Sequence, residues 1–96
     1  MYIGVGWVAL RMPENASLKD KRQVVRSVLQ RLRNDYQVAA AEVGSQDTWT
    51  FAELGISYVS NDARHAEEVL AKAVHAIETS RLDAELMDST IEVLQH

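Results

Sequence analysis

Residues 17–33 read SLKDKRQVVRSVLQRLR, and the rest of the chain is best understood from this stretch. No Gly or Pro interrupts it, and Ser17 followed by Asp20 matches the capping box found at the start of many helices. At 100° per residue, its aliphatic side chains fall on one arc; they are Leu18, Val24, Val25, Val28, Leu29 and Leu32. We therefore predict an amphipathic helix whose apolar arc packs on a core.

Basic residues form a stripe beside the apolar arc of this predicted helix. The stripe consists of Lys19, Arg22, Arg26 and Arg33, whose spacing of three, four and seven residues keeps them on one side. Lys21 instead points into the apolar arc, where its aliphatic stem can cover the core while its ammonium group reaches solvent. Spacing leaves two interpretations of the stripe open, a solvated helix surface and a binding surface for an anionic partner.

Length and composition predict a small globular protein. A chain of 96 residues forms one domain, residues 1–96, and its 47% hydrophobic and 25% charged residues are ordinary for that class. The absence of Cys excludes disulfides, thiolate metal sites and cysteine nucleophiles. The apolar stretch 2–10 is too short to cross a bilayer and has no basic segment before it. We therefore expect a soluble cytoplasmic protein with no membrane partner.

Charge is distributed unevenly along the chain. The net charge is −4, yet residues 11–33 hold seven basic and two acidic side chains, a net of +5. Residues 34–96 hold three basic and twelve acidic side chains, a net of −9. A positive surface on a negative body orients a protein as it approaches a polyanion. We therefore expect weak binding to nucleic acid unless the positive surface itself makes the contact.

The rest of the chain divides into four predicted strands and a second helix. The strands alternate in hydrophobicity or are apolar throughout, and they end at turn-forming residues; they are residues 2–12, 36–43, 48–60 and 84–94. Turn residues at 44–47 predict that the second and third strands form a hairpin. Residues 62–80 follow the N-cap signal Asn61-Asp62 and have apolar residues at helical spacing, which predicts a helix.

The order β-α-β-β-α-β predicts an α+β, ferredoxin-like fold. Right-handed crossovers place both helices on one face of a four-stranded antiparallel sheet. We expect the strand order 4-1-3-2, with the first and third strands central and parallel to each other. Residues 2–12 are apolar on both faces, and Gly4 and Gly6 leave room for close packing on one of them.

This topology leaves one face of the sheet without helices. We expect Val5 and Trp7 on that face, although the sequence does not fix the register. An apolar patch of this size marks an interface. The expected partner is a second copy of the chain, docked sheet to sheet as a homodimer, or another protein docked in the same way.

The sequence contains no catalytic constellation. The histidines His65 and His75 are ten residues apart and do not share a helix face, so no metal site is expected, and nothing indicates a cofactor. The ferredoxin-like fold also hosts acylphosphatases, whose chemistry needs an Arg, an Asn and a Gly-rich loop. Arg11 and Asn61 are present, but the loop at residues 13–16 is PENA, without glycine. A hydrolase therefore remains only a remote alternative.

Three motifs carry a resemblance to a known family. They are SLKDKR (Ser17, Leu18, Lys19, Lys21, Arg22), EVGSQDTW (Glu42, Val43, Gly44, Gln46, Asp47, Trp49) and SND (Ser60, Asn61, Asp62). Over nearly its whole length the chain resembles the YlxP-like family of small bacterial proteins, a domain of unknown function. The resemblance implies a ferredoxin-like fold and no known catalytic activity. It also implies a link to transcription or translation, because family genes often lie beside those for a termination factor, an initiation factor and a ribosome-binding factor.

The residues and the resemblance together favour a non-enzymatic RNA- or ribosome-associated binding module. The expected nucleic-acid contacts are Ser17, Lys19, Lys21, Arg22, Arg26 and Arg33 on the first helix, with Trp49 at the hairpin tip. Trp49 could stack on a base, or it could pack in the core or an interface. The alternative is a protein-interaction or homodimerisation module without nucleic acid, for which Val5 and Trp7 are the expected interface residues.

Overall fold

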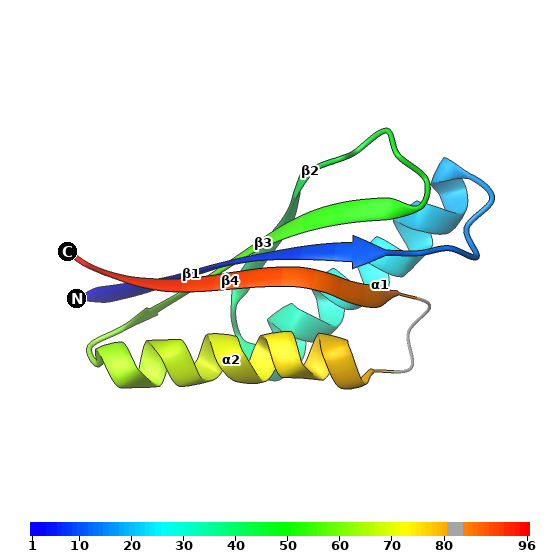
Figure 1. Cartoon of the computed structure of the whole chain (residues 1–96). Coiled ribbons are helices and arrows are strands. Elements are labelled where there is room, and N and C mark those ends of the chain that lie inside the picture. The colour runs from blue at the N-terminus through cyan, green and yellow to red at the C-terminus, as the bar shows by residue number, and fades with distance from the viewer. Residues whose placement is uncertain (81–83) are drawn as a thin grey trace.

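The computed structural model describes residues 1–80 and 84–96. Its elements follow the order β-α-β-β-α-β (Figure 1); they are β1 (Tyr2–Arg11), α1 (Leu18–Tyr36), β2 (Ala39–Gly44), β3 (Phe51–Ser60), α2 (Ala63–Thr79) and β4 (Glu85–Gln95). The strands form one four-stranded sheet in the order β2-β3-β1-β4, which confirms the predicted 4-1-3-2 order. The fold is α+β and ferredoxin-like, as the sequence predicts.

The two central strands run antiparallel, so the expectation that they are parallel is wrong. Tyr2 of β1 pairs with Ser60 of β3, and Arg11 pairs with Phe51. The reason lies in the connections. The α1 crossover makes β2 parallel to β1, and the short β2–β3 turn then reverses the chain, so β3 runs opposite to β1.

The core lies on one face of the sheet, between the strands and the two helices. Val8, Leu10 and Leu54 are fully buried there, together with Leu32 of α1 and Leu70 of α2. A Cβ atom added to Gly4 would lie only 2.7 Å from Leu70 Cδ1, so this glycine allows α2 to pack closely on β1. No helix among residues 1–80 and 84–96 is long and apolar enough to span a membrane.

Helix α1 begins at the predicted cap and ends later than predicted. Ser17 Oγ accepts a hydrogen bond from the Asp20 N–H at 3.1 Å, and Asp20 Oδ2 accepts one from the Ala16 N–H at 2.9 Å. This is a variant of the capping box, because the carboxylate accepts from the residue before the N-cap rather than from Ser17 itself. The helix continues through Tyr36, which was expected in a strand, because no Gly or Pro stops it before Gln37 adopts a left-handed conformation (φ 54°).

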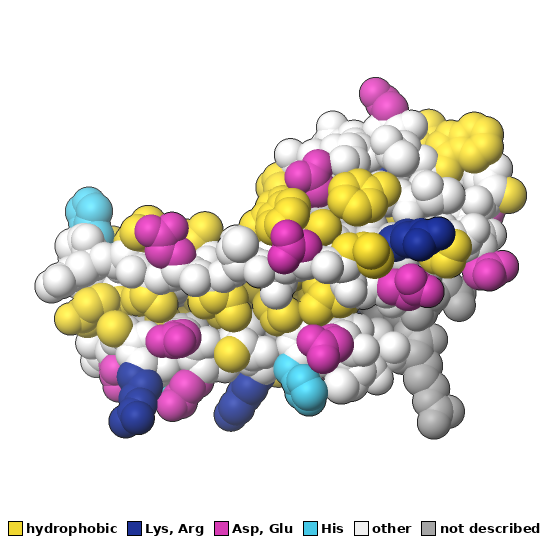
Figure 2. Space-filling view, in the orientation of Figure 1, with side chains coloured by type: hydrophobic (Ala, Val, Ile, Leu, Met, Phe, Trp, Pro, Cys, Tyr) yellow, Lys and Arg dark blue, Asp and Glu magenta, His cyan; other side chains and the backbone are white. Residues whose placement is uncertain are grey.

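The opposite face of the sheet carries no helix, and we call it the open sheet face. Val5 and Trp7 lie on this face, because the residues that alternate with them, Gly4, Gly6 and Val8, face the helices. Figure 2 shows hydrophobic side chains on the side of the sheet away from α2, interrupted by acidic ones.

The two ends of the described chain are joined at one end of the sheet. The Met1 amino group donates to the His96 carbonyl at 2.8 Å, and the His96 N–H donates to the Met1 carbonyl at 2.8 Å. These bonds extend the β1–β4 pairing to the terminal residues. Figure 1 shows the N- and C-termini side by side.

Candidate functional site

The α1 basic stripe, meaning Lys19, Arg22, Arg26 and Arg33, lies on one exposed side of the helix. Within the described part of the chain, the side chains of Lys19, Arg22 and Arg26 form no ion pair or hydrogen bond. The acidic residues of α1 point elsewhere: Asp20 caps the helix, and Asp35 pairs with Arg31 at 3.7 Å. Three positive charges are therefore free to meet an anionic partner.

Arg33 differs from the other members of the stripe. Its guanidinium Nη2 donates to the Ala40 carbonyl on β2 at 2.5 Å. Because β2 is an edge strand, this bond places the Arg33 end of the stripe at the outer edge of the sheet. Arg33 therefore ties α1 to the sheet, and part of its hydrogen-bonding capacity is already used.

Lys21 is buried, which corrects the expectation that its ammonium group reaches solvent and contacts nucleic acid. Its side chain is 2% exposed, and its Nζ lies 3.0 Å from Glu42 Oε2. The same Nζ donates to the Ser45 carbonyl. The physical reason is that a lysine pointing into the core needs polar partners there. The Glu42 carboxylate on β2 supplies an opposite charge, and the Ser45 carbonyl just after β2 supplies a hydrogen-bond acceptor.

Ser45 continues this polar cluster across the sheet. It adopts a left-handed conformation (φ 58°), and its hydroxyl donates to Glu53 Oε2 at 2.7 Å. Glu53 Oε1 accepts a bond from Trp7 Nε1 at 3.3 Å. The cluster therefore connects the start of α1, the β2–β3 turn and the open sheet face.

Trp49 lies in the β2–β3 turn with its side chain 51% exposed, so packing in the core is excluded. The third strand begins at Phe51, three residues later than predicted. Backbone bonds nevertheless fix the turn. The Trp49 carbonyl accepts from Asn15 Nδ2 at 3.0 Å, and the Thr50 carbonyl accepts from the Met12 N–H at 2.7 Å.

Ser17 already has a structural role. Its hydroxyl oxygen accepts a hydrogen bond from the Asp20 N–H. The Asp20 carboxylate lies at the N-terminus of the helix and accepts a hydrogen bond from the Ala16 N–H. A carboxylate at this position occupies the positive end of the helix dipole and repels a phosphate. The structure therefore disfavours the expected phosphate contact of Ser17 at the N-terminus of α1, which stays a prediction.

The open sheet face carries exposed apolar side chains and a shallow hollow. Val5 is 39% exposed, and Val59 and Leu94 are 61% and 44% exposed on neighbouring strands. The hollow has a volume of about 340 Å³ and a floor of small residues; its lining includes Val5, Ala39, Ala41, Val43, Gly55 and Ser57. Trp7 lies half-buried on the same face, and its Nε1 bonds to Glu53.

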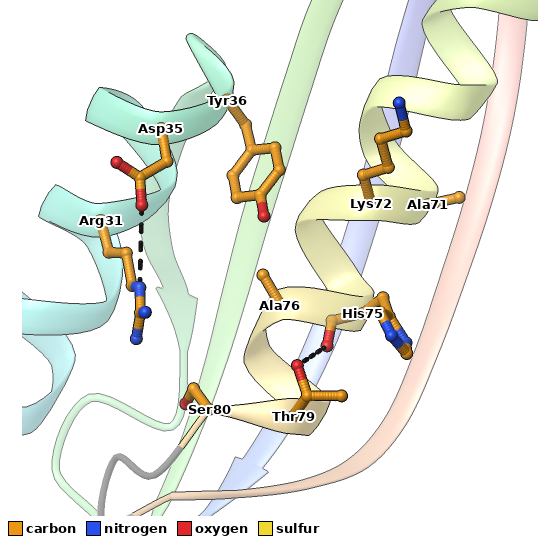
Figure 3. Close-up of a pocket in the computed structure, with 9 residues that line it drawn as sticks. All are labelled: Arg31, Asp35, Tyr36, Ala71, Lys72, His75, Ala76, Thr79 and Ser80. Carbon is orange, nitrogen blue, oxygen red and sulfur yellow. Dashed lines mark hydrogen bonds and ion pairs between the residues drawn. The ribbon is translucent and has the colours of Figure 1, made fainter.

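Sequence reasoning missed a second hollow, which lies between α1 and α2 (Figure 3). Its volume is about 510 Å³, and its lining includes Arg31, Asp35 and Tyr36 from α1 and Lys72 and His75 from α2. Figure 3 shows the His75 ring pointing away from Arg31 and Asp35. The ends of both helices line the hollow, and C-terminal carbonyls disfavour anions. No sequence signal links these residues, because they meet only through tertiary packing.

The residues weighed for a hydrolase do not meet. Arg11 ends β1, whereas Asn61 follows the last residue of β3, which pairs with Tyr2 at the other end of β1. The length of β1 separates Arg11 from Asn61 by about 30 Å. Across residues 1–80 and 84–96, no group of three His, Asp or Glu side chains is arranged to hold a metal ion.

Comparison with known proteins identifies the family of the chain. Residues 3–91 match the family described as "Protein of unknown function (DUF503)". The chain is also 36% identical over 63 residues to the uncharacterized protein YlxP of Bacillus subtilis (strain 168), an alignment that covers 66% of this chain and 68% of the relative. The family match spans most of the chain, from β1 into β4. The chain therefore belongs to the YlxP-like DUF503 family, whose function is uncharacterised.

Proposed function

We propose that this protein is a non-enzymatic module that binds RNA through the α1 basic stripe. The observation that carries the proposal is the set of three exposed basic side chains, Lys19, Arg22 and Arg26, that form no ion pair within the described residues. The net charge of the chain is −4, so this stripe contrasts with its surroundings. Such a contrast directs a polyanion to one surface.

The dimensions of the stripe fit an extended phosphate backbone. At 1.5 Å per residue, the stripe extends about 21 Å from Lys19 to Arg33 along the helix axis. Lys and Arg contacts to phosphates fix position and register but carry no base information. We therefore expect binding to RNA of many sequences. Ribosomal RNA is the first candidate, because the family resemblance implies a link to translation.

Binding to ribosomal RNA and to ribosomal subunits across a salt series tests this function. Four phosphate contacts predict that log affinity falls with log salt at a slope of about −3 to −4. The double variant Arg22→Glu/Arg26→Glu should lose at least tenfold in affinity and keep its fold, because both side chains are exposed.

A matched control distinguishes an effect of the stripe on RNA affinity from an effect of net charge. Arg64→Glu/Lys72→Glu makes the same change in net charge on the exposed surface of α2. This variant should bind RNA almost as well as the parent protein. Equal affinity of the parent protein and both variants would show that the stripe is not the RNA-binding surface.

A second candidate function, homodimerisation, is favoured by the open sheet face. A two-fold interface needs a self-complementary surface, and this face carries both projecting side chains such as Val59 and the hollow floored by Ala41 and Gly55. Light scattering at micromolar concentration should then report a dimer. Val5→Glu should convert it to monomer, whereas Lys19→Glu should not. A parent protein that is monomeric at 100 µM would rule out this assembly.

A further inference from the structure

Trp49 combines exposure with a fixed backbone. Its indole is half exposed, and its sequence neighbours Asp47, Thr48 and Thr50 are also exposed. Bonds from Asn15 Nδ2 and the Met12 N–H hold the carbonyls of Trp49 and Thr50, and the Thr48 N–H donates to the Ser45 carbonyl at 3.1 Å. A large aromatic ring on a constrained turn loses little conformational entropy when it binds a ligand.

The turn lies at the end of α1 where the basic stripe begins. Lys21 of α1 donates to the Ser45 carbonyl, and Asn15, just before α1, donates to the Trp49 carbonyl. These two bonds hold the turn against the first turn of α1, which is the end of the helix at which Lys19 begins the stripe. Figure 1 shows the β2–β3 connection reaching the same end of the molecule as the start of α1.

We propose that Trp49 stacks on an unpaired base, so that the preferred ligand is RNA with a single-stranded segment beside its phosphate contacts. Aromatic side chains next to cations are typical of single-strand binding, because every base presents a π-face. Bases within a duplex are already stacked on both sides and do not offer this face. The inference rests on the proposed function, since the stripe supplies the phosphate contacts that bring the base to Trp49.

Tryptophan fluorescence tests the stacking directly. The chain has two tryptophans, so Trp7→Phe leaves Trp49 as the sole emitter. The probes are an RNA hairpin with a four-adenosine 3′ extension and a blunt hairpin with the same number of nucleotides. The extended hairpin should quench Trp49 emission and bind at least fivefold more tightly than the blunt hairpin. Trp49→Ala should remove this preference, and Trp49→Tyr should retain part of it.

The loss of the Trp7–Glu53 bond could disturb the Trp7→Phe variant, so a second measurement uses the parent sequence. Labelling with 5-fluorotryptophan gives two ¹⁹F resonances, and the extended hairpin should shift the one that Trp49→Tyr removes. Salt-dependent binding of both hairpins with equal affinity and no change at Trp49 would overturn the stacking inference and leave the proposed function standing. Binding of neither hairpin would overturn the proposed function itself.

Discussion

Lys21 and Arg22 are neighbours in sequence, yet they belong to two different regions of α1. Lys21 lies on the buried side, where its ammonium group forms an ion pair with Glu42 and donates to the Ser45 carbonyl. Arg22 lies on the exposed basic stripe and meets no partner among the described residues. The difference shows that the angle of a basic residue around the helix determines whether its charge holds the protein together or is available to a ligand.

The largest expected effect comes from removing the buried charge. Lys21→Met leaves the Glu42 carboxylate largely buried without its partner, which should lower the free energy of unfolding by about 3 kcal/mol. The matched variant Lys19→Met on the exposed stripe should change it by no more than about 0.5 kcal/mol. Urea unfolding followed by circular dichroism measures both. Equal effects would mean that the two regions of α1 do not differ in this way.

A double variant sharpens the interpretation of Lys21. Replacing both partners, Lys21→Met/Glu42→Met, removes the uncompensated charge and should recover much of the lost stability. The coupling free energy of the cycle then reports the pair itself rather than the packing of either side chain. Additive losses in the two single variants would assign the effect of Lys21→Met to packing alone.

An intermediate effect is expected at Ser17, where the two regions meet at the start of α1. Ser17→Ala removes the acceptor for the Asp20 N–H and should cost about 1 kcal/mol in thermal or urea unfolding. Ser17→Asp should retain most of the stability, because Asp is an equally good N-cap. RNA affinity of the folded Ser17→Ala protein should match that of the parent. A tenfold loss would reassign Ser17 to the binding site.

The smallest effect is expected at Arg33, the member of the stripe that also bonds to the sheet. Arg33→Gln should change the slope of log affinity against log salt by less than Arg26→Gln, for which a full phosphate contact predicts a change of about 0.7 to 0.9. Its loss of the bond to Ala40 should lower the free energy of unfolding by about 0.5 kcal/mol, because Arg33 is exposed. The reverse order of slopes would make Arg33 the stronger phosphate contact.

The sequence predicted the order of helices and strands because the spacing of hydrophobic residues and the helix-capping residues can be identified within each short segment. The Ser17–Asp20 capping box and the Asp62 N-cap stand where their chemistry placed them. The ends of elements were less accurate. Tyr36 lies in α1 because the helix runs to the left-handed Gln37. Trp49 and Thr50 lie in the turn before β3, although the Met12 N–H bond to the Thr50 carbonyl continues the β1–β3 pairing by one residue.

The sequence predicted only those features of the candidate site that depend on the spacing of residues along α1. Helical spacing placed Lys19, Arg22 and Arg26 together and placed Lys21 in the apolar arc. The partners of Lys21 are Glu42 and Ser45, more than twenty residues away, and the pairing arises from the packing of β2 against α1. Exposure of Trp49 likewise depends on tertiary bonds to the loop before α1, which no local pattern contains.

The paired terminal residues Met1 and His96 have a practical consequence. Because their backbones already exchange two hydrogen bonds, a linker of a few residues could join them without disturbing the sheet. New ends could then be opened in the loop between β1 and α1, giving a circular permutant in which β4 and β1 become consecutive strands of a hairpin. Such a permutant would carry the same helix face and the same turn with a different order of segments along the chain. Its RNA affinity would show whether binding depends on the arrangement of these segments in space alone.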